Sequence, residues 1–274
     1  MLVLAVNQTE GTRRMTSEIN RNIALDLYLD LLKRSLTGTL YEPEPDAGSE
    51  SQVTFWRDFI QHYIKGSAVS MLPIVRFDHL QSCIANVVAD NVPGDMIETG
   101  VWRGGATIFM RAMLKALGVA DRTVWVADSF EGLPEPDAEK FPIEAEFHHG
   151  SVAKDVYHHL AVGLDEVQAN FKAYKMLDDR VKFLKGWFKD TLPRAPIKSL
   201  AIMRLDGDYY ESTMDGLANL YDKLSIGGYA IIDDYGEDSW TYCQKAVDDY
   251  RRSHGVVEPL IQVDTSCYYW RRAR

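Results

Sequence analysis

The spacing of hydrophobic residues changes about a third of the way along the chain. Before that point, apolar residues recur every three or four positions over 16–36, 53–65 and 75–89, and this pattern predicts three helices. A proline-containing acidic loop over 41–52 separates the first two helices. The N-terminal third is therefore predicted to be a helical extension, preceded by a disordered leader over 1–15.

From Pro93 onward, short β-branched runs alternate with helical stretches. The predicted strands are 95–98, 123–127, 181–184, 200–205, 229–232, 261–263 and 268–270, and the predicted helices are 106–117, 164–174, 214–224 and 242–254. Such alternation predicts an α/β fold with a doubly wound, mostly parallel sheet, and the close final strand pair predicts an antiparallel edge hairpin. We expect residues 93–274 to form the main domain, with 16–92 as an extension of the same structural unit.

Composition and charge narrow the classes of function. The chain has 274 residues, of which 46% are hydrophobic and 26% charged, as in an ordinary globular protein. Forty acidic residues against 30 basic ones give a formal net charge of -10, which argues against nucleic acids and anionic membranes as partners because both bind basic surfaces. The three widely spaced cysteines, Cys83, Cys243 and Cys267, are expected to be free thiols in a reducing cytoplasm. A small-molecule enzyme or a protein-binding module remains.

Acidic residues end several of the predicted strands, where ligands bind in sheets of this kind. Glu98 ends the first strand, and the following turn has the spacing G-x-x-x-G-G rather than G-x-G-x-x-G, which gives little support to a diphosphate site. An acid before the turn suits a cationic ligand, and Asp128, at the end of the next strand, suits a ribose. Together they indicate a nucleoside with a charged amino-acid tail, S-adenosylmethionine; the alternative is a tight turn with solvated acids.

Three further aspartates predict a metal site. Asp206 ends the fourth strand, and Asp233 and Asp234 end the fifth. Carboxylates brought together at neighbouring strand ends repel one another, and a hard cation such as Mg²⁺ removes that conflict. Asp208 lies further into its turn and is expected to cap the next helix. The alternative is that all of these acids are helix caps and solvated turn residues.

Several sequence blocks carry a family resemblance. They are DMIETGVWRGGATIFMRAMLKA, TVWVADSFEGLP, VKFLKGWFKDTLP, and IMRLDGDYYESTMD with YAIIDDYGE. With LDLYLDLLKR near the N-terminus and YYWRR near the end, the resemblance covers about residues 24–272, and the blocks match in order. The chain closely resembles the macrocin O-methyltransferase family, whose members methylate deoxysugar hydroxyls on antibiotics.

This resemblance implies a class I methyltransferase fold, S-adenosylmethionine as the methyl donor, Mg²⁺ and a homodimer, for which the apolar helix around 25–32 offers a surface. The metal ligands of the family fall on Asp206, Asp233 and Asp234, and the acidic loop corresponds to a substrate-covering lid within 16–92. The implied donor-site residues, including neighbours of the family positions, are Ser70, Met71, Glu98, Gly100, Trp102, Arg103, Asp128, Ser129 and Trp187, with Phe188 beside them.

The expected reaction is transfer of the donor's methyl group to a sugar hydroxyl. Within the family the chain is most similar to members that methylate the 4-hydroxyl of noviose in novobiocin-type aminocoumarins. A macrolide sugar is the alternative acceptor, and a nicotinamide-dependent dehydrogenase is a more remote alternative activity. Asp206 is predicted to accept the proton; because a metal-bound carboxylate is a weak base, His148 and His149, in the long loop after the second strand, are rivals for this role.

Overall fold

The computed structural model describes residues 22–41, 60–150, 159–236 and 241–274. The predicted leader lies outside these ranges. So do most of the acidic loop and the greater part of the helix predicted over 53–65, of which residues 60–64 form a short π-helix.

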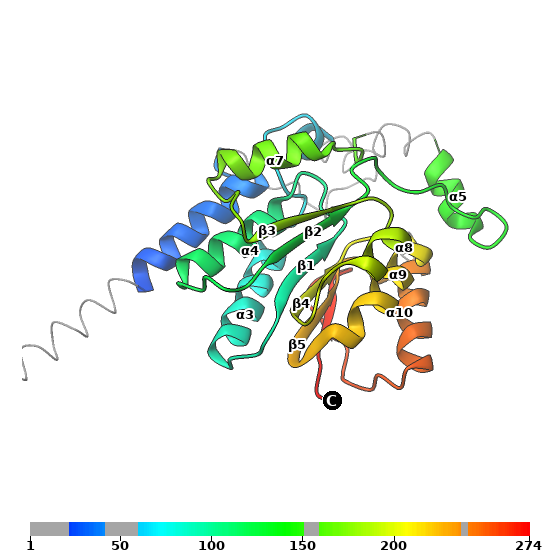
Figure 1. Cartoon of the computed structure of the whole chain (residues 1–274). Helices are drawn as coiled ribbons and strands as arrows, with labels where there is room; N and C mark the ends of the chain where they lie inside the picture. Colours follow the sequence, from blue (N-terminus) through cyan, green and yellow to red (C-terminus); the bar gives the residue numbers. More distant parts are fainter. Residues whose placement is uncertain (1–21, 42–59, 151–158, 237–240) are drawn as a thin grey trace, which may run out of the picture.

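A seven-stranded sheet forms the centre of the molecule, in the order β3-β2-β1-β4-β5-β7-β6 (Figure 1). Its strands are β1 (Asp95–Thr99), β2 (Val124–Asp128), β3 (Val181–Lys185), β4 (Leu200–Leu205), β5 (Leu224–Ile232), β6 (Ile261–Gln262) and β7 (Tyr268–Arg271). The first five are parallel, while β7 is antiparallel to both β5 and β6. The predicted doubly wound sheet with an antiparallel edge hairpin is therefore confirmed.

Helices cover both faces of the sheet, which explains the mainly apolar, buried runs in its central strands such as β2 and β4. Met96 and Ile97 are consecutive and fully buried, yet they belong to the separate hydrophobic clusters of the two faces. One face is covered by a helix over 22–37 together with α3 (Ile74–Ala89), α4 (Gly105–Ala116) and α7 (Leu164–Ala173), and the other by α8 (Phe188–Thr191), α9 (Tyr210–Leu220) and α10 (Thr241–Ser253) (Figure 1).

The helical extension shares the core of the main domain. Leu29 and Leu36, on the helix over 22–37, are buried in the same hydrophobic cluster as Phe109 of α4. The backbone N–H groups of Val69 and Ser70 both donate to the carbonyl oxygen of Leu36, at 2.9 and 3.0 Å. The opposite side of this helix exposes apolar side chains, and Leu27 is 67% exposed.

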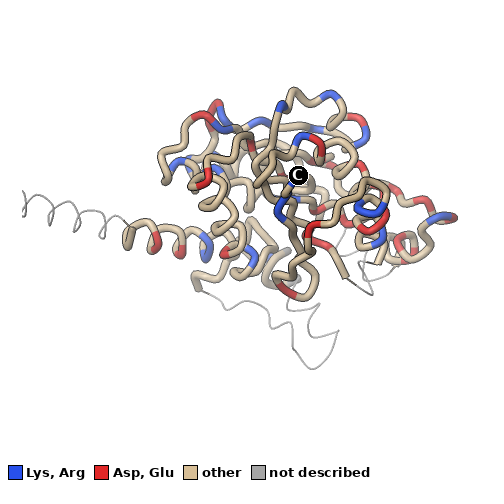
Figure 2. The backbone as a smooth tube through the Cα atoms, turned by 90° about the horizontal axis from the view of Figure 1, so that it is seen from below, with Lys and Arg blue, Asp and Glu red and all other residues tan. Residues whose placement is uncertain are grey.

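Charged residues of both signs are mixed along the described backbone seen in Figure 2. Within the described residues, no helix has the length and apolar character needed to cross a membrane.

The structure differs from the sequence-based expectation at α9, β5 and α5. The helix predicted over 214–224 is instead α9, which begins at Tyr210 and passes into a 3₁₀ turn over Tyr221–Lys223, and β5 starts directly afterwards. Gly227 and Gly228 interrupt the apolar run of this segment, so the sequence pattern predicts only the second half of β5. The predicted loop that carries the two histidines contains α5 (Pro142–His149), which begins with proline, a residue favoured in the first helical turn.

Candidate active site

The carboxyl ends of the parallel strands open onto a cavity of about 420 Å³. Loops that follow β1, β2, β3 and β4 line it, as expected for a ligand site in a doubly wound sheet. The lining includes most of the residues predicted from the sequence, namely Met71, Gly100, Trp102, Asp128, Ser129, Trp187 and Asp206, together with Phe188.

The turn after β1 approaches the end of β4 closely. Gly100 has a φ of 84°, and a Cβ atom at this position would lie 1.7 Å from the backbone oxygen of Asp206. The Asp206 N–H donates to the carbonyl oxygen of Thr99 at 2.9 Å. Only glycine can occupy this position, because the Cβ atom of any other residue would collide with the backbone of Asp206. Gly100 and Asp206 therefore lie side by side in the lining of the cavity.

Asp128 is held rigidly at the end of β2. Its Oδ2 accepts a hydrogen bond from the Val101 N–H at 2.7 Å, and its Oδ1 accepts one from the Phe130 N–H at 2.7 Å. Burial raises the pKa of Asp128, and these two hydrogen bonds oppose the rise. The neighbouring Ser129 hydroxyl donates to the carbonyl oxygen of Gly132 at 2.7 Å. The turn after β1 and the loop after β2 are thereby fixed to each other beside the cavity.

Ser70, Glu98 and Arg103 do not line this cavity, although each was expected at the donor site. The Arg103 guanidinium donates to the carbonyl oxygens of Tyr63 and Ala68, at 3.1 and 2.8 Å. Ser70 is buried against Gly105, where an added Cβ would lie 2.4 Å from the serine Cβ. Ser70 and Arg103 therefore connect the N-terminal extension to the glycine turn.

Asp206, Asp208 and Asp234 form a cluster in which one carboxylate oxygen of each lies within 4.8 Å of the others. Asp208 does not cap α9 as expected: Tyr209 is at the N-cap, without a side-chain cap bond, and Asp208 has a φ of 60°. This left-handed conformation is tolerated by aspartate better than by most residues.

The cluster has the chemistry of a cation site. Within the described part of the chain, the buried Oδ2 of Asp234 has no hydrogen-bond partner. Burial and the neighbouring acids raise the pKa of Asp208 and of Asp234, and burial together with Asp233 raises the pKa of Asp206 to about 6. A hard divalent cation with oxygen ligands relieves this mutual repulsion, so the residues present fit Mg²⁺.

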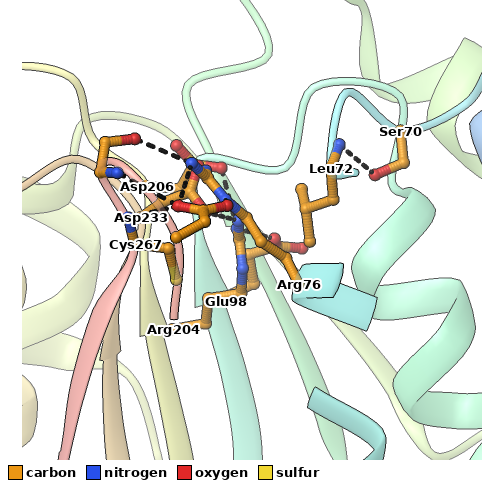
Figure 3. Close-up of polar contacts among 10 residues, drawn as sticks. Ser70, Leu72, Arg76, Glu98, Arg204, Asp206, Asp233 and Cys267 are labelled. Atoms are coloured by element: carbon orange, nitrogen blue, oxygen red, sulfur yellow. Dashed lines mark hydrogen bonds and ion pairs between the residues drawn. The ribbon is translucent and has the colours of Figure 1, made fainter. Parts of the chain in front are cut away.

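Asp233, the third predicted metal ligand, lies outside this cluster of carboxylates. Its Oδ2 is 2.7 Å from Nη1 of Arg76, and its Oδ1 contacts Arg204 (Figure 3). Arg204 also contacts Glu98, and its Nη1 is 2.8 Å from the Oδ2 of Asp206. Although burial opposes it, the charges of Arg204 and Arg76 hold the pKa of Asp233 below its usual value.

Arg204 and Arg76 are site residues that the sequence analysis missed. Arg204 lies in the run LAIMRL, and an arginine inside a buried strand must be paired with acids. Burial raises the pKa of Glu98 to about 8, with the Arg204 charge opposing it. Arg76 also binds Asp264 in the turn between β6 and β7, at 2.6 Å. The two arginines thus join α3 to the ends of β4 and β5.

The two histidines lie at the rim of the cavity rather than in its lining. His149 is 58% exposed at the side chain, and its Nε2 is 2.8 Å from Oε1 of Glu135, which does line the cavity. The Nδ1 of His148 is 2.7 Å from the hydroxyl of Tyr209.

Comparison with known proteins gives the family. Residues 64–272 match Macrocin-O-methyltransferase (TylF). The 8-demethyl-8-(2,3-dimethoxy-alpha-L-rhamnosyl)-tetracenomycin-C 4'-O-methyltransferase of Streptomyces olivaceus is 47% identical over 261 residues, which cover 90% of this chain and 93% of that protein. The Mycinamicin III 3''-O-methyltransferase of Micromonospora griseorubida is 45% identical over 255 residues, covering 91% and 97% of the two chains.

The third relative is the Demethyldecarbamoylnovobiocin O-methyltransferase of Streptomyces niveus, 44% identical over 255 residues, which cover 90% of this chain and 94% of that protein. The solved structure of the O-methyltransferase NovP has a TM-score of 0.79 and 44% identity, over 91% of this chain and 100% of that chain. The chain therefore belongs to the macrocin O-methyltransferase family and is a methyltransferase.

Proposed function

We propose that this enzyme transfers a methyl group from S-adenosylmethionine to a deoxysugar hydroxyl of a glycosylated antibiotic, with Mg²⁺ bound at the carboxylate cluster. The observation that carries the proposal is the position of Asp206 and Asp208. Both residues line the same cavity as Asp128 and Gly100 of the glycine turn. The proposed donor site and the proposed metal site would therefore open into one cavity.

The donor is assigned to the side of the cavity at the ends of β1 and β2. Asp128 is fixed by two backbone hydrogen bonds and is placed to accept hydrogen bonds from a ribose. Trp187 and Met71 supply apolar and aromatic surface in the same cavity, and its acidic lining favours a cationic sulfonium donor.

Replacing Asp128 with asparagine is expected to weaken binding of S-adenosylhomocysteine by roughly tenfold or more, because a charge-assisted hydrogen bond is lost. Isothermal titration calorimetry measures this, and thermal unfolding shows whether the variant is folded. Asp165→Asn, at an exposed acid in the first turn of α7, is the matched control. Equal affinity in wild type and Asp128→Asn would remove the ribose role.

The metal is assigned to Asp206 and Asp234. Bound Mg²⁺ would lower the pKa of a sugar hydroxyl and fix its orientation. The chain's own residues then supply positioning and proton transfer. Asp208 lines the cavity, and in the described part of the chain its side chain has no hydrogen-bond or ion-pair partner. The Oδ2 atom of Asp206, in contrast, is bound by Arg204. Asp208 is therefore the better proton acceptor of the two. Asp206 is the alternative acceptor, and His149 is less well placed at the rim.

The acceptor is the noviose 4-hydroxyl of a novobiocin-type precursor in this proposal, with a macrolide sugar as the alternative. The novobiocin and mycinamicin relatives are almost equally identical to the chain, so identity alone does not choose between their acceptors. The homodimer belongs to the proposal as well, with the exposed apolar side of the helix over 22–37 as its surface; sedimentation of the full chain tests it.

Methyl transfer from labelled S-adenosylmethionine to a panel of desmethyl antibiotic glycosides tests the whole proposal. We expect labelling of a noviosyl acceptor that EDTA abolishes and that added Mg²⁺ restores. Full labelling in EDTA would remove the metal from the reaction, and labelling of a macrolide acceptor alone would favour the alternative substrate. Fluorescence titration with NADH, in parallel with S-adenosylhomocysteine, tests the dehydrogenase alternative.

A further inference from the structure

A second group of metal-ligating side chains lies at the rim of the cavity, apart from the aspartate cluster. It consists of Glu135, His148 and His149, each of which offers one ligand atom within 4.8 Å of the other two. We propose that these three residues form a binding site for a divalent transition-metal ion of the Zn²⁺ class.

The geometry brings two segments of the chain to one point. Glu135 belongs to the loop after β2, whereas the histidines end α5. The Nε2 atom of His149 lies 2.8 Å from Oε1 of Glu135, and the Nε2 atom of His148 lies 3.5 Å from Oε2. Both imidazoles therefore point an Nε2 atom at the same carboxylate, one at each oxygen.

Tyr209 holds the His148 ring in an orientation suited to metal binding. Its hydroxyl, on a buried side chain beside Asp208, is 2.7 Å from Nδ1 of His148. A ring whose Nδ1 donates to an oxygen keeps its Nε2 lone pair for a metal, and metal-binding histidines are commonly oriented by such an outer hydrogen bond. Burial lowers the pKa of His148, with the charge of Glu135 opposing, and this favours the neutral imidazole that metal binding needs.

The donor atoms distinguish this site from the aspartate cluster. Imidazole nitrogens with one carboxylate suit Zn²⁺ and Co²⁺, whereas Mg²⁺ prefers oxygen ligands alone. Three protein ligands leave one coordination position open, as in zinc sites that bind a water or a further ligand. A bound ion would connect α5 to the loop after β2, whose Pro134 and Glu135 line the cavity.

The test uses the full chain, freed of metals and then held in excess Mg²⁺ so that oxygen-only sites are occupied. Titration with Co²⁺ is followed by visible absorption, and Zn²⁺ binding is measured by calorimetry. We expect one Zn²⁺ per chain and an intense, low-symmetry Co²⁺ spectrum that Zn²⁺ abolishes. His148→Ala and His149→Ala should each weaken Zn²⁺ binding at least tenfold, while His254→Ala, on a histidine outside the cluster, should leave it unchanged.

Binding of Zn²⁺ by both histidine variants with wild-type affinity would overturn the proposal, as would a wild-type chain that binds no Zn²⁺. His149 is exposed, so His149→Ala is not expected to disturb folding, and circular dichroism of each variant verifies this. The readout is metal binding itself and does not depend on which substrate the enzyme methylates.

Discussion

Replacing Asp206 with asparagine is expected to weaken Mg²⁺ binding at least tenfold and to lower kcat by a factor of about 10³. Asp206 is the one predicted ligand that both belongs to the carboxylate cluster and lines the cavity, so it faces metal and substrate together. Calorimetric titration of Mg²⁺ and single-turnover methyl transfer from labelled donor measure the two effects separately. Unchanged turnover in Asp206→Asn would remove its central role.

Asparagine variants of the neighbouring acids separate metal binding from proton transfer. If Asp208 accepts the proton, Asp208→Asn loses turnover while it keeps Mg²⁺ affinity; if Asp208 is a metal ligand, it loses both. Asp233→Asn should keep Mg²⁺ affinity if Asp233 stays with Arg76 and Arg204, and should lose it if the ion draws this carboxylate into the cluster. His149→Asn tests the rival proton acceptor; because His149 does not line the cavity, turnover is expected near that of wild type.

The sequence was enough to predict the sheet, because its central strands β2, β4 and β5 contain mainly apolar runs that alternate with helical spacing. It also placed acids at the ends of β1, β2, β4 and β5, since strand ends follow from strand positions. It did not predict which carboxylates face one another. That depends on Arg76, which reaches Asp233 from α3 across 157 positions of the chain, and on the left-handed backbone of Asp208. Neither feature has a local sequence pattern.

The helix α5 was missed for a local reason. Its eight residues, PIEAEFHH, carry too few apolar positions to show a helical stripe, and only Glu144 and Ala145 are buried. Tertiary contacts support it: Oε1 of Glu144 accepts a hydrogen bond from the Tyr210 N–H at 2.7 Å, and the ring of Phe141 stacks on that of Tyr210. Both contacts are made to Tyr210, which lies more than sixty residues away, so periodicity within the segment alone does not predict the helix.

Replacing Arg204 with methionine is expected to lower the free energy of unfolding by about 3–5 kcal/mol, the typical cost of removing one partner from a buried ion pair. Arg204 is 2% exposed and contacts Glu98, Asp206 and Asp233. Methionine retains only the aliphatic part of the side chain, so the loss contains a volume contribution that a second buried arginine-to-methionine variant must share. Urea unfolding followed by circular dichroism measures the change.

Arg111→Met is the matched control, because Arg111 is also buried but, among the described residues, pairs with one partly exposed carboxylate, that of Asp178. Its loss should be smaller, since water can solvate the acid that is left behind. A larger loss for Arg111→Met, or a change below about 1 kcal/mol for Arg204→Met, would contradict this interpretation. The expected difference follows from how the acids are placed: Arg204 pairs with carboxylates at the ends of three adjacent strands, β1, β4 and β5, and one of these acids, Asp206, is also a ligand in the proposed metal site.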